Sequence, residues 1–134
     1  MDRAEDRELL RQILVPVILG NGIRAHRLCL RFYFCYGVRS IVCGKRRGLL
    51  DILDPACDFF KLYSYDSRLI SEELADLSES GGELIMPLFP AESEFMSFVA
   101  ENEELLESRF IICRGKDTDK HLFSRLGFDL VSER

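Results

Sequence analysis

The fold of the chain follows from residues 15–36, which read VPVILGNGIRAHRLCLRFYFCY. The unbroken apolar run Ile13 to Leu19 is typical of a strand that is covered on both faces. Gly20-Asn21-Gly22 then turns the chain, and apolar residues recur at three- and four-residue spacing as far as Tyr36. Gly37 is a typical helix stop. This stretch predicts a buried strand, a glycine turn and an amphipathic helix, the opening unit of a Rossmann-like α/β domain.

The rest of the chain continues the alternation of strands and helices. Further strands are expected at Val38 to Cys43, Phe59 to Tyr63, Glu83 to Leu88 and Phe110 to Cys113. Helices are expected over 4–12 and 68–79, with a single helical turn at 49–53. A long helix is expected from Pro90 and includes Leu105 and Leu106, and a last helix is expected from Asp117 or Thr118. Such alternation predicts parallel βαβ units with right-handed crossovers. The expected fold is a Rossmann-like three-layer α/β/α domain with a mainly parallel sheet of about five strands.

The composition limits both the domain organisation and the compartment. A chain of 134 residues with 47% hydrophobic content predicts one domain over 1–134, with 1–12 as an N-terminal helical extension. The longest apolar run is far shorter than the roughly 20 residues of a membrane span, so no membrane contact is expected. Five cysteines, an odd number without a C-x-x-C pair, predict free buried thiols and a cytoplasmic protein. No metal site is expected, because His26 and His121 are far apart in sequence.

Charge is distributed unevenly along the chain. Residues 1–68 carry 12 Lys and Arg against 8 Asp and Glu, whereas residues 69–134 carry 6 against 15, which gives +4 and −9. The basic half is suited to facing an anion. The net charge of −5 argues against nucleic-acid binding, which needs a positive footprint.

The glycine turn is the first candidate binding site. Gly20-Asn21-Gly22-Ile23-Arg24-Ala25 fits the pattern G-x-G-x-x-G/A between a strand and a helix, where backbone amides can approach an anion. The candidate anion-binding residues here are Gly20, Asn21, Gly22 and Arg24. The alternative interpretation, a tight strand-to-helix turn without a ligand, stays open.

The residues at the end of the second strand distinguish an NAD site from an NADP site. An NAD site would have an acidic residue there, but the chain reads Gly44-Lys45-Arg46-Arg47. Lys45, Arg46 and Arg47 could hold a 2′-phosphate, so an NADP-binding Rossmann fragment is an alternative, as is a solvated loop. With two histidines and no nucleophile signature, the sequence predicts no catalytic residue.

The order of features resembles the N-terminal, pre-ATP-grasp domain of ATP-grasp ligases, in the branch similar to carbamoyl-phosphate synthase large subunits. The resemblance covers about residues 15–130. It starts with the Leu19-Gly20-Asn21-Gly22 turn, the Arg-bearing helix and Gly37-Val38. It continues with the three segments Leu84-Ile85-Met86-Pro87, Ser97-Phe98-Val99-Ala100-Glu101-Asn102-Glu103-Glu104-Leu105 and Phe110-Ile111-Ile112-Cys113, then Asp119-Lys120 and Gly127-Phe128-Asp129-Leu130-Val131.

The chain departs from this family after Pro87. The family commonly has a Thr and an acidic residue in the loop that follows, whereas this chain reads Leu88-Phe89-Pro90 and keeps only Glu92 as a nearby acid. Glu92 therefore joins the candidate substrate-binding residues, together with Lys45 and Arg46.

The resemblance implies a substrate-side domain of a carboxylate-amine ligase that is not catalytic alone. It implies that residues 117–134 begin the connection to an ATP-grasp domain, and that ATP and Mg²⁺ belong to the full-length parent rather than to this chain. The implied partner is a small-molecule substrate held together with that domain. A stand-alone interaction module, which includes a homodimer, remains an alternative.

Overall fold

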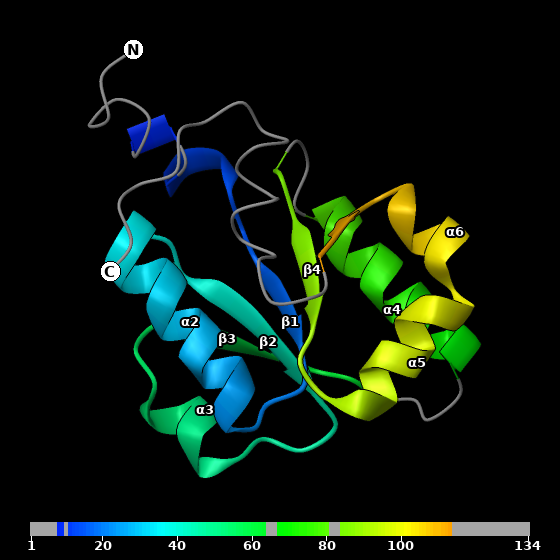
Figure 1. Cartoon of the computed structure of the whole chain (residues 1–134), viewed down its shortest axis with the longest axis horizontal. Helices are drawn as coiled ribbons and strands as arrows, with labels where there is room; N and C mark the ends of the chain where they lie inside the picture. The colour runs from blue at the N-terminus through cyan, green and yellow to red at the C-terminus, as the bar shows by residue number, and fades with distance from the viewer. Residues whose placement is uncertain (1–7, 10, 64–66, 81–83, 114–134) are drawn as a thin grey trace.

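The structure is a computed structural model, and it describes residues 8–9, 11–63, 67–80 and 84–113. Its centre is a five-stranded, all-parallel sheet in the order β3-β2-β1-β4-β5. The strands are β1 (Val17–Leu19), β2 (Ser40–Gly44), β3 (Cys57–Lys61), β4 (Pro87–Pro90) and β5 (Ile111–Ile112). The fold class expected from the sequence, a Rossmann-like α/β domain, is confirmed (Figure 1).

The strand order places a topological switch at β1. The chain runs outward from β1 to β2 and β3, then crosses to the other side of β1 to form β4 and β5. Leu19 at the end of β1 is therefore paired with Cys43 on one side and with Pro90 on the other. Connections that leave β1 and β4 in opposite directions open a crevice at their carboxyl ends, the usual ligand position in such sheets.

Helices cover both faces of the sheet, in three layers (Figure 1). The helices are α2 (Ile23–Tyr36), α3 (Leu49–Leu53), α4 (Ser67–Ser80), α5 (Ser93–Glu101) and α6 (Glu103–Glu107). One core packs Ile18, Cys29 and Phe32 on the α2 side of the sheet. The other packs Leu19, Leu74 and other apolar residues of α4, α5 and α6 on the opposite side. Of the described residues, no helix is long and apolar enough to cross a membrane.

Helix α2 has the boundaries that its glycines predict. Gly22 is the N-cap in an extended conformation, and Gly37 ends the helix in the left-handed region with φ of 72°. The amide of Gly37 donates to the Tyr33 carbonyl, as expected for a glycine that closes the last turn. The helical turn at Leu49–Leu53 is also confirmed.

The long helix expected from Pro90 is wrong in two respects. Pro90 is the last residue of β4, and α5 begins at Ser93. The helix then breaks at Asn102, whose side-chain amide donates to the Phe98 carbonyl at 2.9 Å. An Asn side chain that bonds nearby backbone competes with the regular helix pattern, and the chain restarts as α6.

The remaining boundaries shift by a few residues. Ile13 is helical, and Leu14 meets Ile85 in an isolated parallel bridge, so the continuous strand begins only at Val17. The second strand begins at Ser40 and the third at Cys57 rather than at Val38 and Phe59. The helix expected from Asp117 or Thr118 and the connection over 117–134 lie outside the described residues.

Candidate functional site

The candidate site lies at the carboxyl edge of the sheet, in the crevice between β1 and β4. The glycine turn Gly20–Gly22 leaves β1 and leads into α2, and Glu92 follows β4 as the N-cap residue of α5. Two backbone bonds hold these segments in register: the Gly20 amide donates to the Cys43 carbonyl at 2.8 Å, and the Ala91 amide donates to the Leu19 carbonyl at 2.9 Å.

The side chain of Glu92 lies directly against the glycine turn. A Cβ atom added at Gly20 would lie 2.8 Å from Cδ of Glu92, and one added at Gly22 would lie 3.2 Å from its Oε2. Gly20 also has φ of +115°, which side-chain-bearing residues rarely adopt. The two glycines therefore make room for a carboxylate at the N-terminal end of α2, where the sequence predicts a bound anion.

Asn21 ties the turn to the loop after β2. Its side-chain amide lies 2.7 Å from the Arg46 carbonyl and 2.7 Å from Oδ2 of Asp51. Gly44 permits this approach, because a Cβ there would lie 2.9 Å from Cγ of Asn21. Asn21 thus contributes to the site by holding the backbone of the turn in place.

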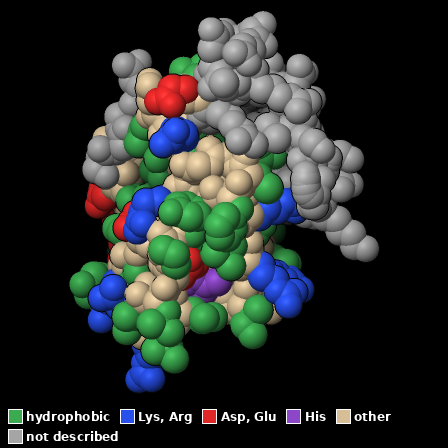
Figure 2. Space-filling model, turned by 90° about the vertical axis from the view of Figure 1, so that its left-hand side faces the viewer, with side chains coloured by type: hydrophobic (Ala, Val, Ile, Leu, Met, Phe, Trp, Pro, Cys, Tyr) green, Lys and Arg blue, Asp and Glu red, His purple; other side chains and the backbone are tan. Residues whose placement is uncertain are grey.

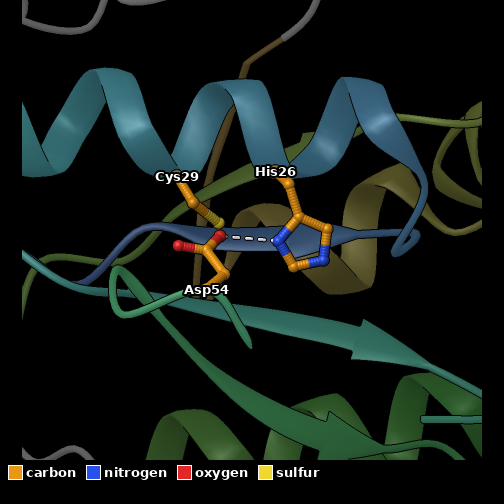
Figure 3. Close-up of side chains that lie close together, drawn as sticks. All are labelled: His26, Cys29 and Asp54. Carbon is orange, nitrogen blue, oxygen red and sulfur yellow. Dashed lines mark hydrogen bonds and ion pairs between the residues drawn. The ribbon is translucent and has the colours of Figure 1, made fainter. Parts of the chain in front are cut away.

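A buried polar cluster lies under this turn, between α2 and the segment that follows β2. His26 projects from the first half of α2, and its Nδ1 lies 2.6 Å from Oδ2 of Asp54 (Figure 3). Its Nε2 lies 2.8 Å from Oδ1 of Asp51. The side chains of all three residues are at most 6% exposed. A neutral imidazole has only one N–H, so two ionised acceptors on one ring require an imidazolium or a shared carboxyl proton.

Two cysteines border this cluster. Cys29 lies one helical turn after His26, with its sulfur beside the Asp54 carboxylate (Figure 3). Burial, followed by the neighbouring Cys57 and Asp54, raises the pKa of the Cys29 thiol well above its ordinary value. Burial and Asp54 likewise raise the pKa of Cys57 to about 11. Both sulfurs are protonated thiols at neutral pH, as the sequence predicts for buried free cysteines.

The predicted basic residues lie in the segments next to the glycine turn. Arg24 is exposed on the first turn of α2, and Arg46 is exposed and reaches the site only through its carbonyl. Lys45 lines a hollow of about 150 Å³ together with Glu94 and Glu101 of α5. Of the predicted binding residues, the structure therefore brings together Gly20, Asn21, Gly22 and Glu92.

A larger hollow, of about 410 Å³, lies at the opposite edge of the sheet. It is lined by Arg11, Gly37, Arg39 and Asp58, among other residues at the amino ends of the strands. Arg39 and Asp58 already satisfy each other there as an ion pair of 2.8 Å. Because ligands of open parallel sheets bind at the carboxyl ends of the strands, we place the candidate site at the glycine turn.

Sequence reasoning missed the cluster of His26, Asp51 and Asp54. The two aspartates follow His26 by 25 and 28 positions. A usable signal was present: His26 and Cys29 are three residues apart on a helix, and Asp51 and Asp54 have the same spacing. Comparison with protein-family models, curated proteins and solved structures finds no match to the chain.

Proposed function

We propose that the chain is the N-terminal, substrate-side domain of an ATP-grasp carboxylate-amine ligase that is similar to carbamoyl-phosphate synthase. The observation that carries the proposal is the carboxylate of Glu92, which lies over the glycine turn at the switch point of the sheet. The parallel α/β fold and the order of sequence motifs from Leu19 to Cys113 support it.

The position of Glu92 favours an amine over a dinucleotide at this turn. A pyrophosphate would have to lie against Gly22 at the start of α2, where Oε2 of Glu92 already lies. Two negative groups at that distance repel each other in a partly buried site. A protonated amine instead gains a charge-assisted hydrogen bond from the same carboxylate.

In such a ligase, ATP with Mg²⁺ would convert the carboxylate substrate into an acyl phosphate, and the amine, after losing its ammonium proton to solvent, would displace the phosphate. Those groups would be held by ATP-grasp lobes outside residues 1–134. Within this chain, Glu92 would orient the amine, and Asn21 would keep the glycine turn fixed beneath it through the Arg46 carbonyl and Asp51. The chain thus positions one substrate and performs no chemical step by itself.

The first test measures nucleotide binding by the 134-residue chain. Calorimetry with MgATP is expected to give a dissociation constant no tighter than millimolar. A fluorescence titration with NADPH is expected to give no saturable signal. NADPH binding that disappears when Lys45, Arg46 and Arg47 are changed to alanine would replace the proposal with an NADP site.

The second test uses the complete ligase that the proposal implies. Glu92→Gln should raise the KM for the amine about 10-fold or more, because a charge-assisted bond contributes roughly 1.5–3 kcal/mol, while the KM for ATP stays unchanged. Glu94→Gln, two residues away and exposed on α5, is the matched control and should leave both values unchanged. Equal effects of the two variants, or no ATP-dependent ligation, would overturn the proposal.

The remaining alternative is an interaction module that works without a small ligand. Light scattering at several protein concentrations distinguishes this alternative from the ligase domain. The average molecular mass of a module that pairs with its own copy rises with concentration. A concentration-dependent mass together with no effect of Glu92→Gln would favour the module.

A further inference from the structure

The buried cluster beneath the glycine turn has the composition of a metal site. A ring nitrogen of His26, Sγ of Cys29 and a carboxylate oxygen of Asp54 all lie within 4.8 Å of one another (Figure 3). A second group made by His26, Asp51 and Cys57 satisfies the same limit. Ligand atoms around a tetrahedral zinc ion are roughly 3.3–3.8 Å apart, from metal–ligand distances of about 2.0–2.3 Å. Movements of about 1 Å would therefore close the first group around one ion.

The spacing of these residues helps to form such a site. His26 and Cys29 are one turn apart on the buried side of α2, and both are nearly fully buried. Asp54 and Cys57 are also three residues apart, in the turn between α3 and the start of β3. A rigid helix and a tight turn thus each supply two ligands from opposite sides, and one thiolate from each side suits a thiophilic cation.

Asp51 is placed to orient the histidine without binding the ion itself. Its Oδ1 faces Nε2 of His26 at 2.8 Å, which leaves Nδ1 toward Cys29 and Asp54. Its Oδ2 is itself fixed by the Gly48 amide at 2.6 Å and by Asn21 at 2.7 Å. A carboxylate that accepts from the second nitrogen of a metal-binding histidine is the usual supporting arrangement of zinc sites.

An independent observation comes from Ser40 on β2. Its hydroxyl oxygen is fully buried and has no hydrogen-bond partner among the described residues. The Ser40 hydroxyl lies beside Cys29, whose thiol is a weak hydrogen-bond acceptor. A buried hydroxyl without a good partner is costly, and a metal-bound thiolate at Cys29 would be a stronger acceptor than the thiol.

We propose that His26, Cys29 and Asp54 bind a zinc ion, and that Asp51 orients His26. Cys57, whose sulfur lies in the second group with His26 and Asp51, would move toward the ion as the fourth ligand. On binding, the Cys29 and Cys57 thiols each lose a proton to solvent as the Zn–S bonds form. The proton shared by Nδ1 of His26 and Asp54 is also released to solvent, so that the Nδ1 lone pair and an Asp54 oxygen bind the ion. The ion would join α2 to the turn before β3 and, through Asp51 and Asn21, would fix the glycine turn.

The experiment uses Co²⁺ as a spectroscopic substitute for zinc in the 134-residue chain under a metal-free reducing agent. We expect one Co²⁺ per chain, with the intense visible bands of tetrahedral Co²⁺ and a thiolate charge-transfer band, both removed by one equivalent of Zn²⁺. Zinc should also raise the melting temperature, since a ligand that binds the folded state stabilises it.

Matched variants identify the ligands. Cys29→Ser should abolish the charge-transfer contribution of that sulfur and weaken Co²⁺ binding at least about 10-fold. Asp51→Asn should weaken Co²⁺ binding about 10–100-fold, while the tetrahedral bands persist. Cys35→Ser, a half-buried cysteine on the same helix, is the control and should match the unmodified chain. Circular dichroism checks the fold, and Cys29→Ala and Asp54→Asn provide the same test if Cys29→Ser unfolds.

Two results would overturn the site. One is the absence of tetrahedral Co²⁺ bands in the unmodified chain, which would leave His26 and the two aspartates as a hydrogen-bonded cluster without a metal. The other is a spectrum that survives in Cys29→Ser and Asp54→Asn but is lost in Cys35→Ser, which would place the ion elsewhere.

Discussion

The two helical layers of the molecule bury different kinds of side chain. On the side of α4, α5 and α6, the core cluster consists of apolar side chains and one buried thiol, including Leu74 and Phe98, and Ser71 is the only buried polar residue among the described residues of these helices. On the side of α2 and α3, His26 and Asp51 are buried beside Cys29. The first layer buries mainly apolar side chains against the sheet, whereas the second combines packing with a set of groups that can carry chemistry.

The outer surfaces of the two layers also differ. The α2 and α3 face exposes hydrophobic side chains around histidine and acidic atoms (Figure 2), and its most exposed apolar residues are Ile23, Phe34, Leu49, Ile52 and Leu53. The helices α5 and α6 present acidic residues, among them the exposed Glu94, Glu101, Glu104 and Glu107. The uneven charge seen in the sequence is thus partly a difference between faces of the fold. We therefore predict that removing a buried polar side chain destabilises the α2 and α3 layer. Removing a buried apolar side chain should destabilise the layer of α4, α5 and α6.

The largest loss is expected from Asp51→Ala in the α2 and α3 layer. The carboxylate accepts hydrogen bonds from His26, Gly48 and Asn21 in a fully buried position. Its removal leaves these donors without an acceptor, and breaking a buried pair in this way costs about 3–5 kcal/mol. Urea unfolding of the metal-free chain measures the change. Asp58→Ala, a 65% exposed aspartate, is the control, and a loss below about 1 kcal/mol for Asp51→Ala would contradict the contrast between the layers.

Leu74→Ala tests the other layer. Leu74 is fully buried in the core of α4, so removing its side chain should cost about 2–5 kcal/mol through lost burial and the cavity left behind. Leu69→Ala, 46% exposed on the same helix, should cost far less. Chemical denaturation gives both values, and Co²⁺ binding should be the same in Leu74→Ala as in the unmodified chain. A loss of Co²⁺ binding in folded Leu74→Ala would mean that the two layers are not independent.

The same contrast explains what could be predicted from the sequence. The apolar periodicity of α2 and the glycines at its ends are local signals, so the helix, its turn and the parallel fold follow from neighbouring residues. The cluster at His26 depends on a crossover that brings α2 against the segment after β2. The three-residue spacing within each pair is a local signal, but the contact between the pairs is not. Pro90 was misleading for a related reason: proline suits both the first turn of a helix and the end of a strand, and the pairing with Leu19 decides.

Gly20→Ala is expected to have an intermediate effect, at the boundary between the layers. The residue has φ of +115°, and the new Cβ would lie 2.8 Å from Cδ of Glu92. Backbone strain of this kind costs about 1–3 kcal/mol, and displacement of Glu92 adds to it. In the double variant with Glu92→Ala, the steric part should be relieved and the backbone part should remain, so the two changes should not be additive in urea unfolding. Full additivity would show that Glu92 does not contact the turn in solution.

Arg39→Ala should have the smallest effect, because its partners lie at the exposed amino edge of β2 and β3. The guanidinium pairs with Asp58 at 2.8 Å and donates to the carbonyls of Cys57 and Pro55, and the bond to Asp58 raises the pKa of Arg39 above its ordinary value. Exposed pairs contribute about 0.2–1 kcal/mol, and the carbonyl bonds add a similar amount, so the loss should be about 1 kcal/mol. It should become smaller at high salt, which screens the ion pair but leaves the carbonyl bonds. A loss of unfolding free energy as large as that of Asp51→Ala, and unchanged by salt, would contradict this. It would mean that the amino edge of β2 and β3 orders the turn before β3 as strongly as the buried cluster does.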